Sequence, residues 1–533
     1  MLDEQLTARR RLSWARVFTV GTLATLTAAG TGLGLVARAE TGDPPGTIRT
    51  VAGVTTNYKQ GGWSGDGGKA SDSQLYNPRA VAFSKTGDVY IGDAMNHRIR
   101  KIDKDGIITT VAGKPANTNA SGNPVGAYGG DGGPATEAQL NQPHGVAVDS
   151  KGNVYVADSL NNRIRKIDTS GTINTIVGSD NKKGRPDGPA ETAVLKFPKS
   201  MFMTPDDVLV ICNTGGNTIL TIDLKASPLM VKRVAGNLYA KRYGGDGKFA
   251  TDAQLNTPQG VWVTKDGSIY ISDSENHLVR KVTPDGKINT IAGNAAAAQQ
   301  AADSGQYPIQ GNSGGDGGPA TSAHLNGPRG ISVDEAGNVY IAEEAGARIR
   351  RIDPSGKIST IAGNGKTKPD GHDPHIPGDP GPAPALEAQF HTMHDLNLDK
   401  DGNLWIADSK NNRVRMVTDP ANAPAGNLPA ETSPSAPSQS PPPSSGSSDG
   451  TQATTSTTAA PDTTSTTAKP EGSSTTTTAA QAEKPEPTTT TTAATQPEPT
   501  TTTTAAKQPE PTTTTTAATQ PADGTPSEPP NNS

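Results

Sequence analysis

The stretch from Gly145 to Gly178 reads GVAVDSKGNVYVADSLNNRIRKIDTSGTINTIVG and contains four short runs with strand character. The runs are Val146–Asp149, Asn153–Asp158, Arg163–Asp168 and Ile173–Val177. Each is rich in Val, Ile or Tyr and alternates apolar with polar residues, which indicates half-buried strands. Gly and small polar residues separate the runs, as tight turns require. The stretch therefore predicts a four-stranded antiparallel meander, whose strands we call a to d in chain order.

The same pattern recurs along the chain. Around the b–c turn the sequence reads IGDAMNHRIRKID from Ile91, VADSLNNRIRKID from Val156, and similar versions follow in four further copies. A lone four-stranded sheet cannot bury both of its faces, so the copies must pack on one another. An acidic residue or Asn marks the end of strand b in each copy, at Asp93, Asp158, Asn213, Asp273, Glu343 and Asp408.

The sixth copy ends after strand c, at Thr418. The missing strand d is supplied by Thr47–Val54, which has no strands a to c before it and resembles Thr172–Gly178. Six sheets then close into a ring, and the last sheet is built from both ends of the folded chain. We therefore predict an all-β fold, a six-bladed β-propeller over residues 45–418, which leaves few strand edges exposed.

The segments outside the repeats differ in composition. Four arginines between Arg9 and Arg16 precede the uncharged run Val17–Ala37, so residues 1–39 are predicted to be a signal peptide or a membrane anchor. Ala37-Arg38-Ala39 resembles a cleavage site, but the run is also long enough to span a bilayer, so both alternatives stay open. Either one places the rest of the chain outside the cytoplasm. Residues 419–533 are rich in Pro, Thr and Ser, lack aromatic residues and are predicted to be a disordered tail.

Charge and cysteine content exclude several classes of site. The net charge is −5, so nothing global points to nucleic acid, and we expect no nucleic-acid partner. Cys212 is the single cysteine, which excludes an intrachain disulfide and a CxxC metal knuckle. It stands in an apolar strand and is interpreted as a small buried thiol.

The recurring motif D-x-x-N-x-R-[IV]-R-K-[IV] after an apolar strand resembles the NHL repeat family. The added GGDGGPAT-x-A-x-L segments resemble the bacterial and teneurin-type branch of that family. The resemblance covers about residues 47–418 and implies the propeller fold, but this fold serves lyases, hydrolases, adhesive domains, RNA binders and receptor sensor domains. The third copy departs most, with Thr218 in place of Arg, and the fifth has Ala345-Gly-Ala347 in place of Asn-Asn or Asn-His.

The shared residues of the repeat are interpreted as scaffold because they recur. The Asp would close the b–c turn, and the Asn and Arg would tie neighbouring blades. The GGDGGPAT loops, which include Asp131 and Asp316, have two interpretations. They could form an acidic or anion-cradling ring around a pocket, or a repeated clasp between blades in which Asp caps backbone amides. The second is favoured because the motif recurs in most blades.

The residue just before each strand a is predicted to lie at the top mouth of the central channel, on the face that carries the b–c turns and the long loops. The copies differ at this position. Convergent basic residues would attract an anionic group. The alternative is that these side chains pair with loop carboxylates such as Asp131 and close the channel. The six predicted ligand-binding residues are Arg79, His144, Lys199, Gln259, Arg329 and His394.

The histidines of the mouth allow a test for a metal. NHL-type amidating lyases, which this arrangement resembles, hold zinc over the channel with three histidines on alternate blades. Here His144 and His394 stand at two of those positions, but Gln259 occupies the third and is a poor zinc ligand. His391 could substitute only if its segment were helical. We therefore expect no cofactor, no metal and no catalytic residue, and His144 and His394 are the residues that a metal would use.

These observations favour an exported or membrane-anchored NHL-repeat propeller, a monomer, that acts as a non-catalytic ligand-binding or scaffold module at the cell envelope. Its partner would be an extracellular protein, peptide or glycan, with an anionic group at the top mouth. The alternative is an extracellular metal-dependent lyase or lactonase with its site at the same mouth. Both ends of the propeller are predicted to leave from the bottom face, so a retained N-terminal anchor would turn the top mouth outward.

Overall fold

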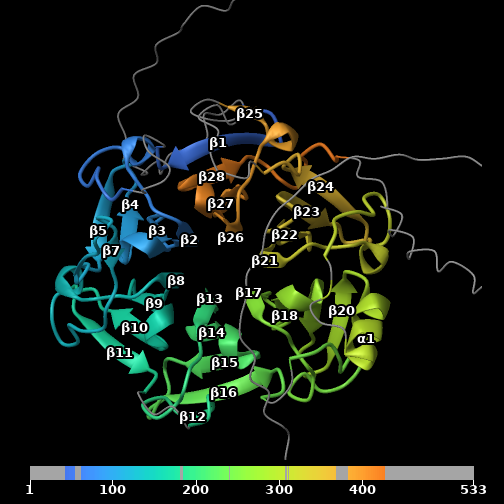
Figure 1. Ribbon diagram of the computed structural model, residues 1–533, viewed down its shortest axis with the longest axis horizontal. Coiled ribbons are helices and arrows are strands. Elements are labelled where there is room, and N and C mark those ends of the chain that lie inside the picture. The colour runs from blue at the N-terminus through green and yellow to red at the C-terminus, as the bar shows by residue number, and fades with distance from the viewer. Residues whose placement is uncertain are drawn as a thin grey trace, which may run out of the picture. The chain divides into compact units, whose positions relative to one another are not determined.

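The computed structural model describes residues 43–54, 62–179, 184–238, 241–305, 309, 311–367 and 382–426. These residues form six sheets of antiparallel strands, arranged as blades around a central channel (Figure 1). The predicted six-bladed all-β propeller is thus confirmed. The predicted signal or anchor (residues 1–39) and the tail beyond Gly426 lie outside the described residues. No helix within these ranges is long and apolar enough to cross a membrane.

Each blade consists of four strands, which follow one another from the channel to the rim. Blade 1 contains β2 (Pro78–Phe83), β3 (Val89–Asp93), β4 (Arg98–Ile102) and β5 (Ile108–Ala112). Blade 2 contains β8 (Pro143–Val148), β9 (Val154–Asp158), β10 (Arg163–Ile167) and β11 (Ile173–Val177). Blade 3 contains β13 (Pro198–Met203), β14 (Val208–Asn213), β15 (Thr218–Asp223) and β16 (Met230–Ala235). Blade 4 contains β17 (Pro258–Val263), β18 (Ile269–Asp273), β19 (Leu278–Val282) and β20 (Ile288–Ala292). Blade 5 contains β21 (Pro328–Val333), β22 (Val339–Glu343), β23 (Arg348–Ile352) and β24 (Ile358–Ala362).

Blade 6 joins the two ends of the folded chain, as predicted. It contains β26 (Met393–Leu398), β27 (Leu404–Asp408), β28 (Arg413–Val417) and, as its outer strand, β1 (Thr47–Ala52). In the register of this pair, Ile48 of β1 stands opposite Val417 of β28. The packed part of the chain extends past the predicted boundary at residue 418, because Ala423 is buried and the backbone N–H of Gly426 donates to Thr360 O. The backbone N–H of Gly46 donates to Thr418 O, so both ends of the propeller lie together on the bottom face.

Small elements decorate the loops. The α-helix α1 (Ala295–Ser304) follows blade 4, begins at an Asn294 cap and ends at Gly305, which has a left-handed conformation. The two-residue strands are β6 (Asn117–Thr118), β7 (Pro124–Val125), β12 (Gly188–Pro189) and β25 (Ala383–Pro384). The 3₁₀ turns on the long loops are η1 (Ala70–Asp72), η3 (Ala135–Glu137), η7 (Ala320–Ser322) and η8 (Ala385–Glu387). Those in the b–c turns are η2 (Ala94–Asn96), η4 (Ser159–Asn161), η5 (Thr214–Gly216), η6 (Ser274–Asn276) and η9 (Ser409–Asn411).

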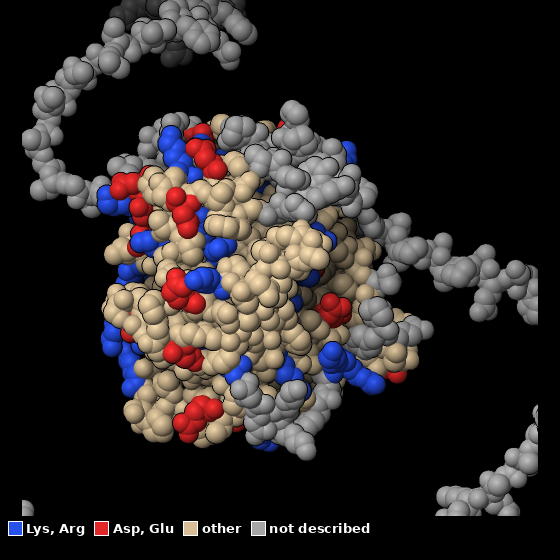
Figure 2. Space-filling view, turned by 60° about the vertical axis from the view of Figure 1, so that its left-hand side comes forward, with Lys and Arg blue, Asp and Glu red and all other residues tan. Residues whose placement is uncertain are grey.

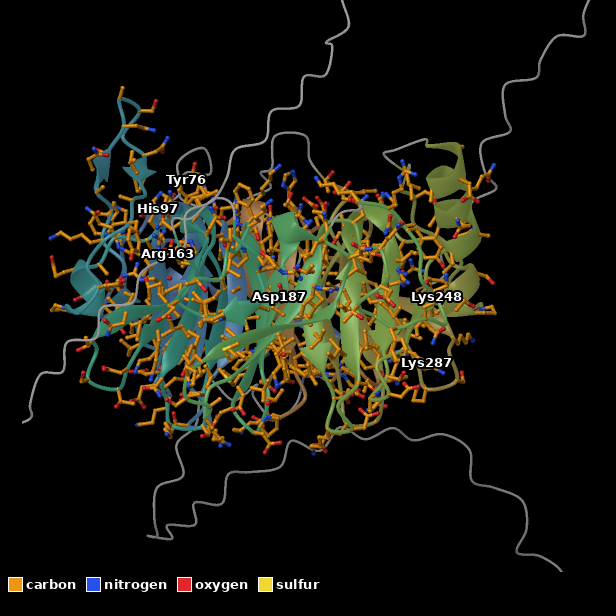
Figure 3. The ribbon with its side chains drawn as sticks, turned by 90° about the horizontal axis from the view of Figure 1, so that it is seen from below. Tyr76, His97, Arg163, Asp187, Lys248 and Lys287 are labelled. Atoms are coloured by element: carbon orange, nitrogen blue, oxygen red, sulfur yellow. The ribbon has the colours of Figure 1, made fainter. Side chains whose placement is uncertain are left out.

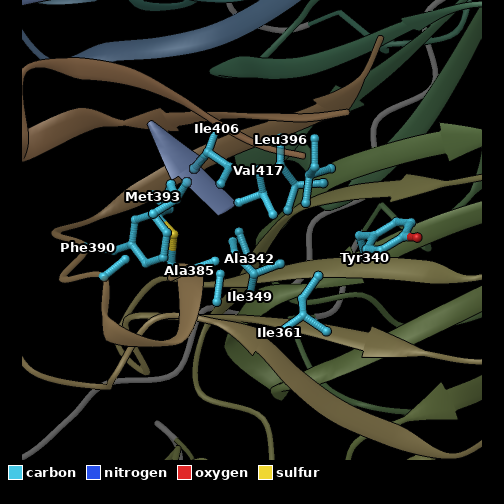
Figure 4. Packing of buried hydrophobic residues seen from close by; sticks show 14 of the residues in the cluster. Tyr340, Ala342, Ile349, Ile361, Ala385, Phe390, Met393, Leu396, Ile406 and Val417 are labelled. Carbon is cyan, nitrogen blue, oxygen red and sulfur yellow. The ribbon is translucent and has the colours of Figure 1, made fainter. Parts of the chain in front are cut away.

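The core lies between neighbouring blades rather than at the channel axis. Between blades 5 and 6, for example, Tyr340 and Ile349 pack against Phe390, Met393 and Leu396 (Figure 4). Similar buried clusters fill the other seams, and Cys212 is fully buried in the cluster between blades 3 and 4, as predicted. Burying both faces of every sheet in this way removes most of its apolar surface from water, the dominant stabilising contribution.

The long loops cover the outer edge of the blades. After strand d ends, the backbone N–H of Gly113 donates to Ala135 O in the next loop, and the equivalent bond joins every other pair of neighbouring blades. The same loop then pairs with strand d of its own blade, as Pro134 does with Thr172. The GGDGGPAT loops are therefore the predicted clasp between blades, and they also shield the edge that strand d would otherwise expose.

The two faces of the ring carry different turns. In the edge-on view, His97 in a b–c turn lies nearer the upper face and Lys287 in a c–d turn lies nearer the lower one (Figure 3). Acidic and basic side chains are mixed over the side that Figure 2 turns forward, with no wide field of one sign. A concentration of charge is found instead at the channel mouth.

Candidate functional site at the channel mouth

The seams between blades place the mouth residues. Each b–c turn ends at a residue with positive φ, and in five of six seams the side chain of this residue accepts a hydrogen bond from the next blade. The donor is the backbone N–H of the second residue before the mouth position. This confirms that the repeated Asn ties neighbouring blades. The five acceptors are His97, Asn162, Asn217, His277 and Asn412, and blade 5 has Ala347 at this position.

The repeated Arg and Asp hold the loops and do not reach the mouth. Arg165 is fully buried, and its Nη2 lies 2.6 Å from Asp131 Oδ1 while its Nη1 lies 3.4 Å from Asp158 Oδ2. The same arrangement joins Arg100 to Asp66, Arg280 to Asp246 and Arg350 to Asp316. Asp131 is held by Arg165 and does not pair with the mouth cations, but one of these cations, Arg329, does pair with a loop carboxylate, Glu344.

The mouth residues belong to strand a itself, which corrects the predicted position just before it. The first residue of the strand, such as Pro143, pairs with the end of strand b, and the ladder resumes only at Val146 in blade 2. A register shift of this kind occurs at the start of all six inner strands. A bulge re-aims the side chains that it contains. The second residue of each strand, including His144, thus lies at the bulge on the top face.

The structure brings five of the six predicted residues around one small cavity. The cavity measures about 10 Å³, the space that a single water molecule needs. Arg329 does not line it and instead forms an ion pair with Glu344. The lining residues are Arg79, His144, Gly145, Lys199, Ser200, Gln259, His394 and Asp395.

Hydrogen bonds link the mouth residues in pairs. Arg79 Nη1 contacts His144 Nε2, and it also lies 3.3 Å from Gln142 Oε1. Lys199 Nζ donates to Gln259 Oε1 at 3.0 Å. Within the described ranges, neither Arg79 nor Lys199 forms a salt bridge with a carboxylate. Two of the three cations are therefore held by neutral hydrogen-bond partners, although the charge of Glu344 acts on both.

The histidines stand side by side. The ring centroids of His144 and His394 lie 5.9 Å apart in an edge-to-face arrangement, and His394 Nδ1 lies 2.8 Å from Ser409 Oγ. Burial, followed by the charges of neighbouring cations, holds the pKa of both rings well below the ordinary value. Both imidazoles are thus neutral at pH 7.

The electrostatics show an excess of positive charge. Burial and the nearby Arg329 lower the pKa of Arg79 to about 10, and burial with the charges of Arg329 and Arg79 lowers the pKa of Lys199 to about 8. Such lowered values mean that the cations are crowded and partly stripped of water. A bound anion would relieve both costs.

Sequence reasoning missed two carboxylates. Asp395 lines the cavity, accepts a hydrogen bond from the backbone N–H of Val81 at 3.2 Å, and has its pKa raised to about 7 by burial. It could have been found because the equivalent position is Ala80, Gly145, Ser200, Gly260 or Gly330 in the other blades. Glu344 stands where Ser159, Ser274 and Ser409 occur in other blades, so the same comparison of copies would have found it.

No metal centre forms at the mouth among the described residues, which contain no group of three or more His, Cys, Asp or Glu that could hold an ion. Gln259 occupies the third position of the predicted triad. His391 precedes β26 in a non-helical bend, so the helical geometry that could have brought it beside His394 is absent. The two rings alone supply too few ligands for zinc.

A second cavity, of about 190 Å³, lies toward the other end of the channel. The ends of the inner strands of blades 1, 2, 3 and 6 line it, including Phe83, Val148, Met203 and Leu398. None of its lining residues is charged. The channel wall that these four blades form at this end is therefore uncharged.

Comparison with known proteins identifies the repeats. Residues 39–129, 123–188, 238–304 and 302–378 match the family described as "Teneurin NHL domain". The gap at 189–237 coincides with blade 3, the copy that departs most from the repeat, and the residues beyond 378, which include blade 6, are also unmatched. Teneurin-3 of Mus musculus is 30% identical over 288 residues, which is 50% of this chain and 10% of that protein. NHL repeat-containing protein 2 of Gallus gallus is 27% identical over 372 residues, which is 65% of this chain and 47% of that protein. The chain thus spans about a tenth of the teneurin and about half of the second relative.

Solved structures resemble the propeller at low sequence identity. An auxiliary nutrient binding protein from Bacteroides thetaiotaomicron VPI-5482 is 12% identical, with a TM-score of 0.46 over 70% of this chain and 76% of the other. A virginiamycin B lyase from Staphylococcus aureus is 16% identical, with a TM-score of 0.38 over 72% of this chain and 89% of the other. Similarities at this level have no bearing on function.

Proposed function

Because the chain belongs to the family of teneurin NHL domains, in which the repeat specifies a scaffold, we propose that its function resides at the mouth, where the copies differ. The protein is a non-catalytic binding module that holds an anionic group of an extracellular partner over the channel. The partner is a protein, peptide or glycan that carries this group.

The observation that supports this proposal is the set of three cations on alternate blades. Arg79 and Lys199 point their charge into the mouth with only neutral hydrogen-bond partners, and Arg329 shares its charge with Glu344. Convergent, partly dehydrated donors bind carboxylate, phosphate or sulfate oxygens more strongly than exposed ones do. The excess positive charge also steers anions toward the mouth.

The cellular setting of the proposal rests on the sequence. The arginines before Val17 and the uncharged run up to Ala37 support export or membrane anchoring. Gly46 N–H donates to Thr418 O at 2.8 Å, so the segment that follows the exported N-terminus enters the propeller from the bottom face. The mouth would then face away from an anchoring membrane and remain accessible to a partner.

A metal-dependent lyase or lactonase is the second candidate. It draws on the adjacent rings of His144 and His394. A zinc site there requires a third protein ligand, and Gln259, which occupies that position, is a poor zinc ligand. Metal analysis of the purified full-length chain tests it directly. Near-stoichiometric zinc that is lost in H144A/H394A would replace the binding proposal with this one.

Calorimetric titration of the full-length chain with inorganic phosphate tests the binding proposal. We expect saturable binding that weakens about tenfold in R79Q and in K199Q, since each change removes a charge-assisted hydrogen bond. Lys151 lies exposed in an a–b turn on the bottom face, so K151Q changes net charge equally and serves as the matched control. Absence of saturable binding, or an equal loss in K151Q, would contradict the proposal.

A further inference from the structure

Blade 3 places an exposed aromatic ring on the top face, two residues before the mouth residue Lys199. Phe197 is 48% exposed although it is among the few phenylalanines of the chain. It has a φ of +46°, a conformation that bulky residues rarely adopt. Its backbone N–H donates to Asn162 Oδ1 at 2.8 Å, which fixes it in the seam between blades 2 and 3. An exposed ring held in an unfavourable backbone conformation requires an explanation.

Equivalents of Phe197 in two other blades contact a mouth residue. In blade 1 the equivalent residue is Asn77, whose Oδ1 accepts a hydrogen bond from Arg79 Nε at 3.1 Å. In blade 2 it is Gln142, whose Oε1 accepts from Arg79 Nη1 at 3.3 Å. In blades 1 and 2 the side chain at this position therefore reaches the mouth cation Arg79. Phe197 stands two residues before Lys199 in the same way.

A glycine beneath the ring makes room for it. Gly215 in the b–c turn of blade 3 lies so close that a Cβ atom on it would stand 2.9 Å from Phe197 Cδ2. The equivalent residues in the other blades all carry side chains: Met95, Leu160, Glu275, Ala345 and Lys410. In blade 3 alone, a small residue in the turn is combined with a large residue beside the mouth.

A second exposed apolar side chain stands in the b–c turn of blade 2. Leu160 is 40% exposed and lies in the same turn as Asn162, whose side chain bonds to Phe197. The b–c turn of blade 2 and the start of blade 3 thus present apolar side chains on the top face, next to the cationic mouth. The combination is amphipathic.

We propose that the mouth binds an organic anion whose charged group is attached to a ring with a flat apolar face, and that Phe197 is the platform for that ring. This inference rests on the proposed anion-binding function and specifies its ligand class. The charged group meets Lys199 and Arg79, and the ring, aromatic or sugar, stacks on Phe197. A stacked pair of rings contributes enough for a preference of roughly three- to tenfold over the same anion without a ring.

The test compares three probes on the full-length chain: inorganic phosphate, phenyl phosphate and α-D-glucose 1-phosphate. The key variant is F197N, because asparagine tolerates positive φ and already occupies this position as Asn77 in blade 1. The matched control is T257N, which makes the same change at the equivalent position of blade 4, where φ is +52°. Thermal unfolding of both variants verifies that the fold is retained.

We expect at least one ring-bearing phosphate to bind about three- to tenfold more tightly than inorganic phosphate. F197N should abolish the difference in affinity between ring-bearing and inorganic phosphate, and T257N should leave that difference unchanged. Preference for phenyl phosphate alone would identify an aromatic ligand, and preference for the sugar phosphate would identify a glycan. If inorganic phosphate binds and no ring-bearing probe binds better, or F197N weakens all probes alike, the ring platform is refuted while the anion site stands. If no probe binds, both proposals fail.

Discussion

The backbone N–H of Asn77 donates a hydrogen bond to Oδ1 of Asn412 at 2.8 Å, across 335 residues of sequence. This contact closes the ring between blades 6 and 1 and repeats the local pattern of four other seams. Asn412 has a φ of +55°, so asparagine serves both the backbone conformation and the bond.

Replacing Asn412 should separate these two contributions. N412G keeps the left-handed conformation accessible but removes the acceptor, at a cost of about 1–3 kcal/mol for the N–H left without a partner. N412A adds the strain of a left-handed alanine, about 1–2 kcal/mol more. Chemical denaturation of the two variants measures the difference. Equal stabilities for both variants and the parent would mean that the seam does not depend on this residue.

Blade 3 predicts how the buried ion pairs respond to mutation. At the position of Arg165 it has Leu220, and at the position of Asp158 it has Asn213, whose Nδ2 donates to Thr218 Oγ1. R165L in blade 2 leaves the buried Asp158 carboxylate without its cation and should cost about 3–5 kcal/mol. The double variant D158N/R165L copies blade 3 and should recover part of that loss. A double variant no more stable than R165L would show that the neighbouring blade cannot adopt the uncharged arrangement.

Two histidines should make the propeller sensitive to acid. His97 Nδ1 and His277 Nδ1 each accept a backbone N–H from the next blade at 3.0 Å, which requires the neutral ring. Burial lowers the pKa of both below the ordinary value of 6.5. Below about pH 6.5 these two positions therefore bind more protons in the unfolded chain than in the folded one, so their contribution to stability falls as pH decreases.

The chain supplies the control for this pH effect, because asparagine serves the same role in blades 2, 3 and 6. H97N/H277N should keep the seam bonds and show a smaller loss of stability between pH 6.5 and 5 than the parent. Unfolding free energies measured across this range provide the comparison. His144 and His394 remain in the variant, so a residual slope is expected. Identical slopes would contradict the assignment.

Anion binding at the mouth should weaken as pH rises. The pKa of Lys199 is about 8, so its charge is present below that pH and lost above it. We expect phosphate affinity to fall from pH 7 to pH 9, although phosphate itself gains negative charge over this range. K199R, which keeps its charge throughout this range, should reduce this fall, and the part that remains comes from Asp395. A parent profile as flat as that of K199R would contradict this role.

Asp395 should oppose the bound anion. Its carboxyl lines the same cavity and has a pKa of about 7, so it is largely charged at pH 8.5 and largely protonated at pH 6. D395N should therefore tighten phosphate binding several-fold at pH 8.5 and have little effect at pH 6. The amide oxygen can still accept from Val81 N–H, so the strand geometry is retained. An equal effect at both pH values would show that the change acts through structure rather than charge.

Much of the fold could be predicted because the same four-strand pattern recurs in six copies of the sequence. Thr47–Val54 was recognisable as the missing strand, since it matched Thr172–Gly178 and the sixth copy lacked a partner. The mouth residues could be predicted from a different observation, because they occupy a position where otherwise similar copies carry different residues. Their bulge was not predictable, because a register shift depends on pairing across strands and leaves no mark in one strand.

The partners of the mouth residues depend on contacts between blades. Glu344 replaces a serine that elsewhere bonds the next blade, and only the assembled ring shows that its carboxylate meets Arg329. Likewise, Phe390 stands where other blades have Leu, and it packs beside Ala347, which replaces the larger Asn or His. Such compensations involve residues from different copies, so a reading of each copy by itself does not reveal them.

The closure of blade 6 sets the order in which the protein can be completed. Strand β1 emerges first during synthesis, but its partner β28 is the last strand of the propeller to be made. Until then β1 lacks the strand that pairs with its edge, and the first blade exposes the face that packs against blade 6. Closure of the ring is therefore a late step in folding. The entropic cost of closing a long loop comes before the stabilising contacts of the closed blade can form. A chain interrupted before residue 413 would retain five blades and an open seam, and it would be vulnerable to aggregation at that seam.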